Sequence, residues 1–162
     1  MFERKNILFG NKQGFGLIEL LVVIILLGTI IAIAVPMSRT ILGRTRLETA
    51  ADKIVVELRW SQMEAILKNR PYRVEIYPDN RYLIYYLDPA KVLVREGKYA
   101  AGIDLLVKKY GELVPVEDKL TLGFNELGHA SYARTIGLAD DGKQVIKIIV
   151  GTWMGRIRVE KE

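Results

Sequence analysis

A long and almost entirely apolar run near the N-terminus constrains this chain more than any other feature of its sequence. The run extends from Phe15 to Val35, which is 21 residues, and Glu19 is the only charged residue in it. As a helix it would be about 31 Å long, which matches the hydrocarbon core of a bilayer. A carboxylate in hydrocarbon costs about 2.5–3.5 kcal/mol at the centre of a helix and less near an end. Glu19 therefore indicates a functional site, and it needs a partner.

Three interpretations of this run compete. A secretory signal peptide is compatible with the small residues Ala32 and Ala34, but the run is longer than the usual apolar core of about 7–15 residues. A plain single-pass anchor accounts for the length and leaves Glu19 unexplained. The third interpretation is a helix that leaves the bilayer and packs in a protein assembly. Cleavage after Gly14 would give Phe15 a new α-amine about one helical turn from Glu19, and this amine could neutralise the carboxylate.

The string "KQGFGLIELLVVIILLGTIIAIAVP" resembles the class III prepilin signal of type IV pilins and pseudopilins. The features that match are a short basic leader ending in Gly14, then Phe15, Glu19, the apolar run and Pro36. The resemblance implies that a membrane prepilin peptidase cuts after Gly14 and N-methylates Phe15. It also implies that Glu19 guides docking of the subunit into a helical filament. Gly16 departs from the family, which often has threonine there.

The apolar run continues into an amphipathic segment. Pro36 removes one helical hydrogen bond and can kink a helix without ending it. Beyond it, apolar residues recur at a spacing of three, four or seven and predict one buried helix face: Leu47, Ala51, Ile54, Leu58 and Ala65. The sequence predicts a single helix from about Phe15 to about Asn69, since Pro71 pushes the residue before it out of the helical region.

The rest of the chain has the pattern of strands. A hairpin is predicted from "YRVEIYP" and "RYLIYYLD" around the turn residues Asp79 and Asn80. Residues 88–118 have helical or irregular character and are left unassigned. Four further strands are predicted at "KLTLGF", "SYARTIGLA", "QVIKIIVG" and "GRIRVE". The predicted fold class is α+β, a pilin-like long helix packed against a C-terminal antiparallel β-sheet domain.

The expected organisation has four parts. They are the leader (1–14), the transmembrane and assembly helix (15–36), the amphipathic half of the same helix (37–69) and the β-rich globular domain (70–162).

The second half of the chain resembles the H-type minor pseudopilins, the GspH/FimT family. That family has a helix ending in an Ala-Ile…Asn element and a C-terminal pattern of strand residues around glycine and arginine. The matching positions here are Ala65, Ile66, Asn69, Thr135, Ile136, Leu138, Ile149, Val150, Gly155, Arg156, Ile157 and Val159.

Composition argues against most catalytic and metal chemistry. The chain has no cysteine and a single histidine, His129, so a catalytic triad or a cysteine/histidine metal site is not expected. Phosphate-loop and nucleophile-elbow motifs are also lacking. We therefore expect no enzyme activity, no cofactor and no metal.

Two basic features raise nucleic-acid binding as an alternative. The net charge is +5, and Arg156 and Arg158 alternate along the last predicted strand, so they share a face and are possible DNA contacts. Tyrosines of the predicted hairpin are interleaved with arginines, which is compatible with base stacking but is better explained by ordinary cross-strand packing.

The resemblance implies a minor pilin-like structural subunit of a type II secretion pseudopilus or a type IV pilus. It would sit in the cytoplasmic membrane with its C-terminal domain outside, and then in a periplasmic or cell-surface filament. Its expected partners are other pilin-like subunits, the prepilin peptidase, the inner-membrane assembly platform and the membrane itself. The alternative is a DNA-binding minor pilin for DNA uptake. The sequence leaves open which system the subunit serves, its place at the tip or in the shaft, and the envelope type.

Overall fold

The computed structural model describes residues 16–140 and 144–161, without the side chains of residues 34–41 and 154. The chain divides into two compact units, Met1–Thr40 and Ile41–Glu162. The predicted leader, including the cleavage position Gly14, and the predicted methylation site Phe15 lie outside the described residues.

One helix, α1 (Leu17–Leu67), accounts for most of the first unit and continues into the second. Its bounds agree with the predicted helix to within about two residues, and it passes through Pro36 without ending. In the first unit its side chains from Leu17 to Ile33 are exposed. Among the residues that the structure describes, no helix is long and apolar enough to cross a membrane.

The C-terminal end of α1 is closed by a left-handed residue. Asn69 has a φ of 48°. Its N–H donates to the carbonyl oxygen of Ile66 at 3.3 Å, and the N–H of Arg70 donates to that of Ala65 at 3.2 Å. This pair of bonds satisfies the last carbonyls of the helix, and asparagine tolerates the conformation better than most residues. Asn69 therefore turns the chain toward the first strand, together with Pro71, which the sequence indicates as the end of the helix.

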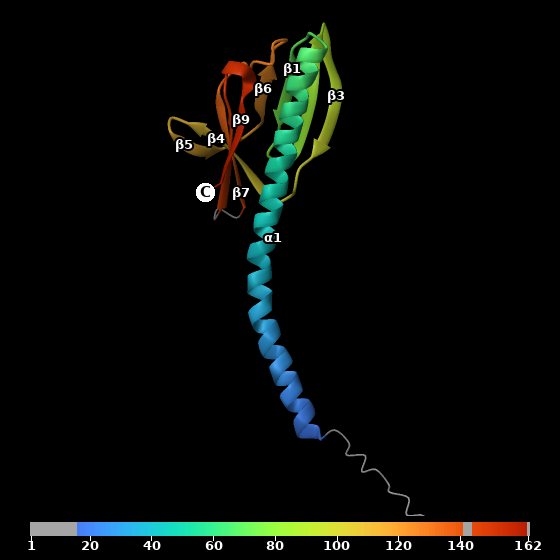
Figure 1. The fold of residues 1–162 in the computed structure, drawn as a ribbon, viewed down its shortest axis with the longest axis vertical. Coiled ribbons are helices and arrows are strands. Elements are labelled where there is room, and N and C mark those ends of the chain that lie inside the picture. Colours follow the sequence, from blue (N-terminus) through green and yellow to red (C-terminus); the bar gives the residue numbers. More distant parts are fainter. Residues whose placement is uncertain (1–15, 141–143, 162) are drawn as a thin grey trace, which may run out of the picture. The chain divides into compact units, whose positions relative to one another are not determined.

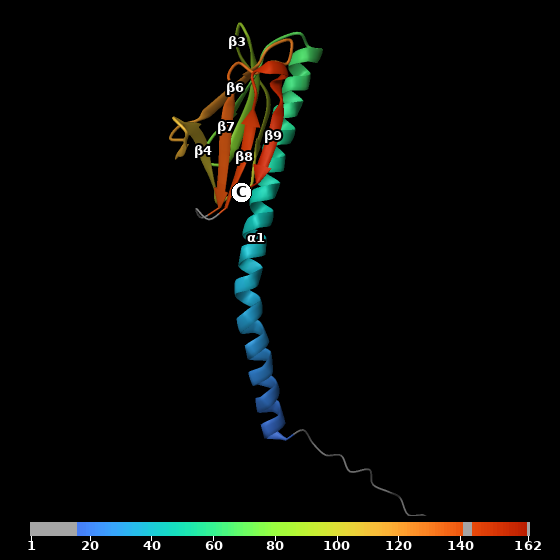
Figure 2. The same ribbon diagram turned by 60° about the vertical axis from the view of Figure 1, so that its left-hand side comes forward.

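The second unit contains two antiparallel sheets (Figures 1 and 2). In chain order the strands of sheet A are β1 (Tyr72–Ile76), β2 (Arg81–Asp88), β3 (Ala90–Lys98) and β6 (Leu120–Phe124), arranged as β3-β2-β1-β6. Those of sheet B are β4 (Ile103–Lys109), β5 (Glu112–Pro115), β7 (Arg134–Asp140), β8 (Gln144–Val150) and β9 (Ile157–Lys161), arranged as β5-β4-β7-β8-β9. A short 3-10 helix, η1 (Trp153–Gly155), connects β8 to β9.

The predicted α+β class is confirmed, but the β-domain has two sheets where one was expected. The unassigned segment 88–118 supplies β3, β4 and β5. β3 and β5 are edge strands, and no residue of either is fully buried. An edge strand exposed on both faces lacks the apolar alternation by which strands are recognised, which explains why the sequence leaves this segment open.

The core of the second unit lies between α1 and the two sheets (Figures 1 and 2). The five positions predicted to form the apolar helix face are all buried: Leu47, Ala51, Ile54, Leu58 and Ala65. They meet alternating strand residues such as Val74 of β1 and Ile148 of β8. Burial of apolar surface of this kind is the main favourable term in folding, at about 25 cal/mol per Å².

A buried carboxylate ties α1 to sheet A. Glu57 is 2% exposed. Its Oε1 accepts a hydrogen bond from the Tyr82 hydroxyl at 2.9 Å and lies 3.0 Å from Lys53 Nζ, while its Oε2 lies 3.3 Å from Arg95 Nη1. The hydrogen bond with Glu57 raises the pKa of the Lys53 ammonium. These partners come from α1, β2 and β3, so the network fixes the helix against the edge strand β3 and its neighbour β2.

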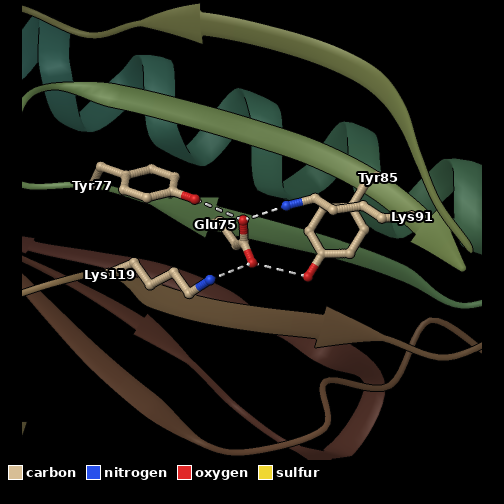
Figure 3. A network of polar contacts seen from close by, with 5 residues as sticks. All are labelled: Glu75, Tyr77, Tyr85, Lys91 and Lys119. Atoms are coloured by element: carbon tan, nitrogen blue, oxygen red, sulfur yellow. Dashed lines mark hydrogen bonds and ion pairs between the residues drawn. The ribbon is translucent and has the colours of Figure 1, made fainter.

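A second buried carboxylate lies on the other face of sheet A (Figure 3). Glu75 of β1 is 3% exposed and has four partners. Oε2 accepts from Lys91 Nζ at 2.7 Å and the Tyr77 hydroxyl at 2.9 Å, and Oε1 accepts from the Tyr85 hydroxyl at 3.0 Å and Lys119 Nζ at 3.1 Å. Burial alone would raise the pKa of this carboxyl, but the hydrogen bonds outweigh burial and lower it to about 2.

Candidate functional site: the assembly segment and a basic face of sheet B

Glu19, the predicted docking residue, lies in the first turn of α1 with its side chain exposed. The turn is closed by hydrogen bonds from the N–H groups of Glu19 and Leu20 to the carbonyl oxygen of Gly16, at 2.9 and 3.2 Å. An acidic side chain at this end of a helix is favoured by the helix dipole. The roles of Gly14, Phe15 and Glu19 in processing and docking stay predictions.

The structure places Arg156 and Arg158 together, though not as the sequence predicts. Arg158 lies in β9, whereas Arg156 precedes that strand and follows η1. Both side chains are exposed and line one surface hollow of about 430 Å³. The other lining residues of this hollow are Ile149, Gly151, Thr152 and Trp153. The prediction that both arginines lie on the strand is wrong, because a 3-10 turn takes up the residues just before it.

The loop that carries Arg156 is held against α1. Gly155 has a φ of +53°, a conformation that favours glycine. A Cβ at this position would collide with Gln62 Nε2 and the carbonyl oxygen of Gly128. These two atoms are themselves joined by a hydrogen bond of 2.8 Å, in which Gln62 donates. The loops that contain Gly128 and Gly155 therefore both approach Gln62 closely. This close approach requires glycine at residue 155 and fixes the loop before β9.

A second hollow adjoins the first. It has a volume of about 460 Å³ and shares Ile149 and Gly151 with the first hollow. Its remaining lining residues are Lys108, Tyr132, Ala133, Arg134, Thr135 and Val150. Sequence patterns alone do not single out Lys108, Tyr132, Arg134 or Trp153. A tryptophan in the turn "TWMG" is the one signal that could have drawn attention to this surface, since an aromatic ring there has little core to pack into.

The hairpin tyrosines do not form a stacking platform. Tyr72, Tyr82 and Tyr85 are buried. The Tyr72 ring packs against that of its cross-strand partner Tyr86, with 5.6 Å between ring centroids. Cross-strand packing, the preferred interpretation of this segment, is confirmed.

His129 lies in the loop between β6 and β7 and is partly buried. Its backbone N–H donates to Asn125 Oδ1 at 2.8 Å, and its carbonyl oxygen accepts from the N–H of Asn125 at 3.0 Å. These bonds organise a tight loop around Gly128. Over residues 16–140 and 144–161, no group of three or more acidic, histidine or cysteine side chains is arranged to hold a metal ion.

Comparison with known proteins gives a motif and a fold. Residues 10–35 match the prokaryotic N-terminal methylation motif. None of the curated protein sequences matches the chain. Among solved structures, the type IV minor pilin FimU of Pseudomonas aeruginosa is similar at a TM-score of 0.57 and 20% identity, with 72% of this chain and 90% of FimU covered. A second crystal form of FimU gives a TM-score of 0.55 and 17% identity, with 70% of this chain and 91% of FimU covered.

The minor pseudopilin EpsH from the type 2 secretion system of Vibrio cholerae is similar in the same way. Its TM-score is 0.56 at 16% identity, and the match covers 72% of this chain and 97% of EpsH. The fold is thus the fold of minor pilins and minor pseudopilins. The chain combines the class of fold found in type IV pilin-like proteins with an N-terminal methylation motif. The prediction of this class from the sequence is confirmed.

Proposed function

We propose that the chain is a minor pilin-like structural subunit of a type II secretion pseudopilus or a type IV pilus. The observation that carries the proposal is the presence, in one chain, of an N-terminal methylation motif at residues 10–35 and a β-domain with the fold of FimU and EpsH. The similarity to these two proteins favours a structural role over the alternative of DNA uptake.

Processing is the first step of the proposed pathway. A prepilin peptidase would cut between Gly14 and Phe15 and methylate the new amine of Phe15. The chain would be a substrate of this enzyme rather than a catalyst. Before assembly, the apolar run from Phe15 to Val35 would hold it in the cytoplasmic membrane as a single span, with the C-terminal domain outside the cytoplasm.

Assembly would then exchange lipid for protein around the same helix. The exposed apolar side chains of α1 can contact helices of other subunits at little cost, because hydrocarbon and apolar side chains are similar environments. Glu19 is the exception, since lipid offers its carboxylate no partner. The α-amine of Phe15, on the same or a neighbouring chain, would supply one. This pairing of the Glu19 carboxylate with the amine would favour the filament over the free membrane form and would set the register of docking.

Other pilin-like subunits and an inner-membrane assembly platform are the partners that this pathway requires. The finished filament would lie in the periplasm or at the cell surface.

Processing can be tested by expressing the full chain with and without a prepilin peptidase and measuring its intact mass. We expect loss of residues 1–14 and gain of one methyl group on Phe15 only when the peptidase is present. Gly14→Asp should prevent both changes. An unprocessed wild-type chain in the presence of an active peptidase, shown active on a control prepilin, would contradict the proposal.

A further inference from the structure

The outer face of sheet B combines exposed aromatic rings with cations around an apolar floor. Trp153 is 86% exposed and Tyr132 is 67% exposed. They lie at the two adjoining hollows described above, whose shared floor is Ile149 and Gly151. Three cationic side chains of this face line the same hollows: Lys108, Arg156 and Arg158. We call these five side chains and Ile149 the Trp153 face.

The register of the sheet brings the Trp153 face together from distant parts of the sequence. Ile149 of β8 pairs with Thr135 of β7 on one side and with Arg158 of β9 on the other. Paired residues in neighbouring strands project to the same side of a sheet. Ile149 therefore lies at the centre of this side, while the inward neighbours Ile148 and Val150 belong to the core.

The cations of this face differ from many others in the domain. Elsewhere, Lys53, Lys91 and Lys119 lie within about 3 Å of a carboxylate of the same chain. In the part of the chain that the structure describes, the three cations of the Trp153 face make no ion pair. They are free to pair with acidic groups of another molecule.

We propose that the Trp153 face docks a neighbouring pilin-like subunit, through a segment that carries carboxylates beside an apolar or aromatic side chain. This inference rests on the proposed function, because that function supplies the neighbouring subunit. Arg156 and Arg158 pair with the carboxylates, and the apolar side chain enters the hollow between Ile149 and Trp153. Tryptophan, tyrosine and arginine are the residues that most often dominate the energy of protein interfaces.

The chemistry of the face favours a protein segment over a nucleic acid. A polyanion is bound best by a row of cations that follows its backbone. Here the arginines flank an apolar floor, and Glu160 follows two residues after Arg158 on the same side of β9, opposite Lys147 of β8. A carboxylate at this border repels a polyanion that extends across the sheet, whereas a short acidic segment can end before it.

The loop that presents Trp153 is held in place before any partner binds. The contact of Gly155 with Gln62 and Gly128 fixes the end of η1 against α1. Preorganisation of this kind reduces the entropy lost on binding.

The test uses the full chain in cells of its own host. A photoreactive phenylalanine analogue replaces Trp153, and in a second strain Tyr132; a third strain carries it at the exposed residue Leu87 of β2 as a control position. We expect irradiation to give an adduct from the first two positions that mass spectrometry identifies as another pilin-like protein. The linked peptide should contain carboxylates next to an apolar side chain.

Substitutions then test the role of the arginines. Arg156→Gln with Arg158→Gln should reduce the adduct yield about tenfold or more, because arginine is among the residues most often found at interface hot spots, and tenfold corresponds to about 1.4 kcal/mol. Arg59→Gln, an exposed arginine of α1, should leave the yield unchanged. Absence of an adduct, an adduct with a protein that is not pilin-like, or a yield insensitive to the arginines would overturn the proposal. So would a nuclease-sensitive complex with DNA that requires Arg156 and Arg158.

The mass of the free chain in the same samples separates the two proposals. A processed, methylated chain that forms no adduct would agree with the proposed function and contradict the docking role of the Trp153 face. A chain that is never processed would argue against the proposed function itself.

Discussion

Lys119 Nζ lies 3.1 Å from Oε1 of Glu75, and this ion pair joins the segment that leaves sheet B to the first strand of sheet A. Lys119 directly precedes β6, so it marks the point where the chain returns from the β4–β5 hairpin. The same carboxylate also binds Lys91 of β3. One buried charge thus connects an inner strand, an edge strand and the link between the sheets (Figure 3).

Glu75→Gln should therefore destabilise the β-domain. The glutamine side chain has the same shape but no charge, so the two ammonium groups and two hydroxyls around it lose their anionic acceptor. Disrupting a buried network of this kind costs about 1–3 kcal/mol. Urea unfolding of the full chain in detergent, followed by near-ultraviolet circular dichroism, measures the change in the free energy of unfolding. Glu96→Gln, at an exposed position of β3, is the matched control and should change it by less than about 0.5 kcal/mol.

The pH dependence of stability follows from the same carboxyl. The pKa of Glu75 is about 2 in the folded protein, below the ordinary value of 4.5 that the carboxyl has in the unfolded chain. A lowered pKa means that Glu75 contributes stability above about pH 4.5 and that this contribution is lost as the pH falls toward 2. The wild-type chain should lose more stability over this interval than Glu75→Gln does. Parallel pH profiles for the two proteins would contradict the assignment.

Tyr82→Phe should weaken the attachment of α1 to sheet A. The change removes the hydroxyl that donates to Glu57 Oε1 at 2.9 Å and leaves a buried carboxylate with one donor fewer. We expect a loss of about 1–3 kcal/mol in the free energy of unfolding. Tyr132→Phe, which alters an exposed ring, should be close to neutral. Equal stability of the two variants would show that the hydroxyl of Tyr82 contributes nothing.

The helix, its buried face and its end could be predicted from the sequence because their signals are local. Apolar spacing over Leu47–Ala65 and the proline at residue 71 depend only on near neighbours. Glu75 could not be predicted in the same way. Strand alternation places it on the side of β1 away from the helix, where a charge is expected to be solvated. It is buried because side chains from β2, β3 and the β5–β6 link fold over it, and these contacts are set by tertiary pairing.

The Trp153 face escaped prediction for a related reason. Arg156 and Arg158 are two residues apart in the sequence and could be paired from it, whereas Lys108 reaches the same surface only through the order of the strands in sheet B. β4 lies in the segment that the sequence leaves unassigned, so the sheet order could not be derived.

Gly155→Ala should destabilise the loop before β9 for two reasons, the positive φ and the collision with Gln62 and Gly128. Gly102→Ala is a useful control, because Gly102 has a φ of +76° and open space around its Cβ position. Strain alone costs about 1 kcal/mol, so Gly155→Ala should cost clearly more than Gly102→Ala. The excess should shrink when Gln62→Ala is combined with Gly155→Ala, and a double-mutant cycle of unfolding free energies measures this coupling.

Glu19→Ala should leave membrane insertion and peptidase processing intact and reduce incorporation into filaments. The reason is that only the assembled state offers the carboxylate a partner, so its removal affects docking and not cleavage. Cell fractionation and the intact mass report the first two properties, and the amount of chain in sheared filaments reports the third. Thr29→Val, at another exposed polar position of α1, is the control. A filament yield equal to that of the wild type would remove the docking role of Glu19.

The composition of purified filaments tests the central claim most directly. Filaments sheared from host cells are digested, and the N-terminal peptide of this chain is sought by mass spectrometry. The account predicts a peptide that begins with N-methylated Phe15 in the filament fraction and its loss when the prepilin peptidase is deleted. A chain found only in membranes, with residues 1–14 still attached in cells that assemble filaments normally, would contradict it.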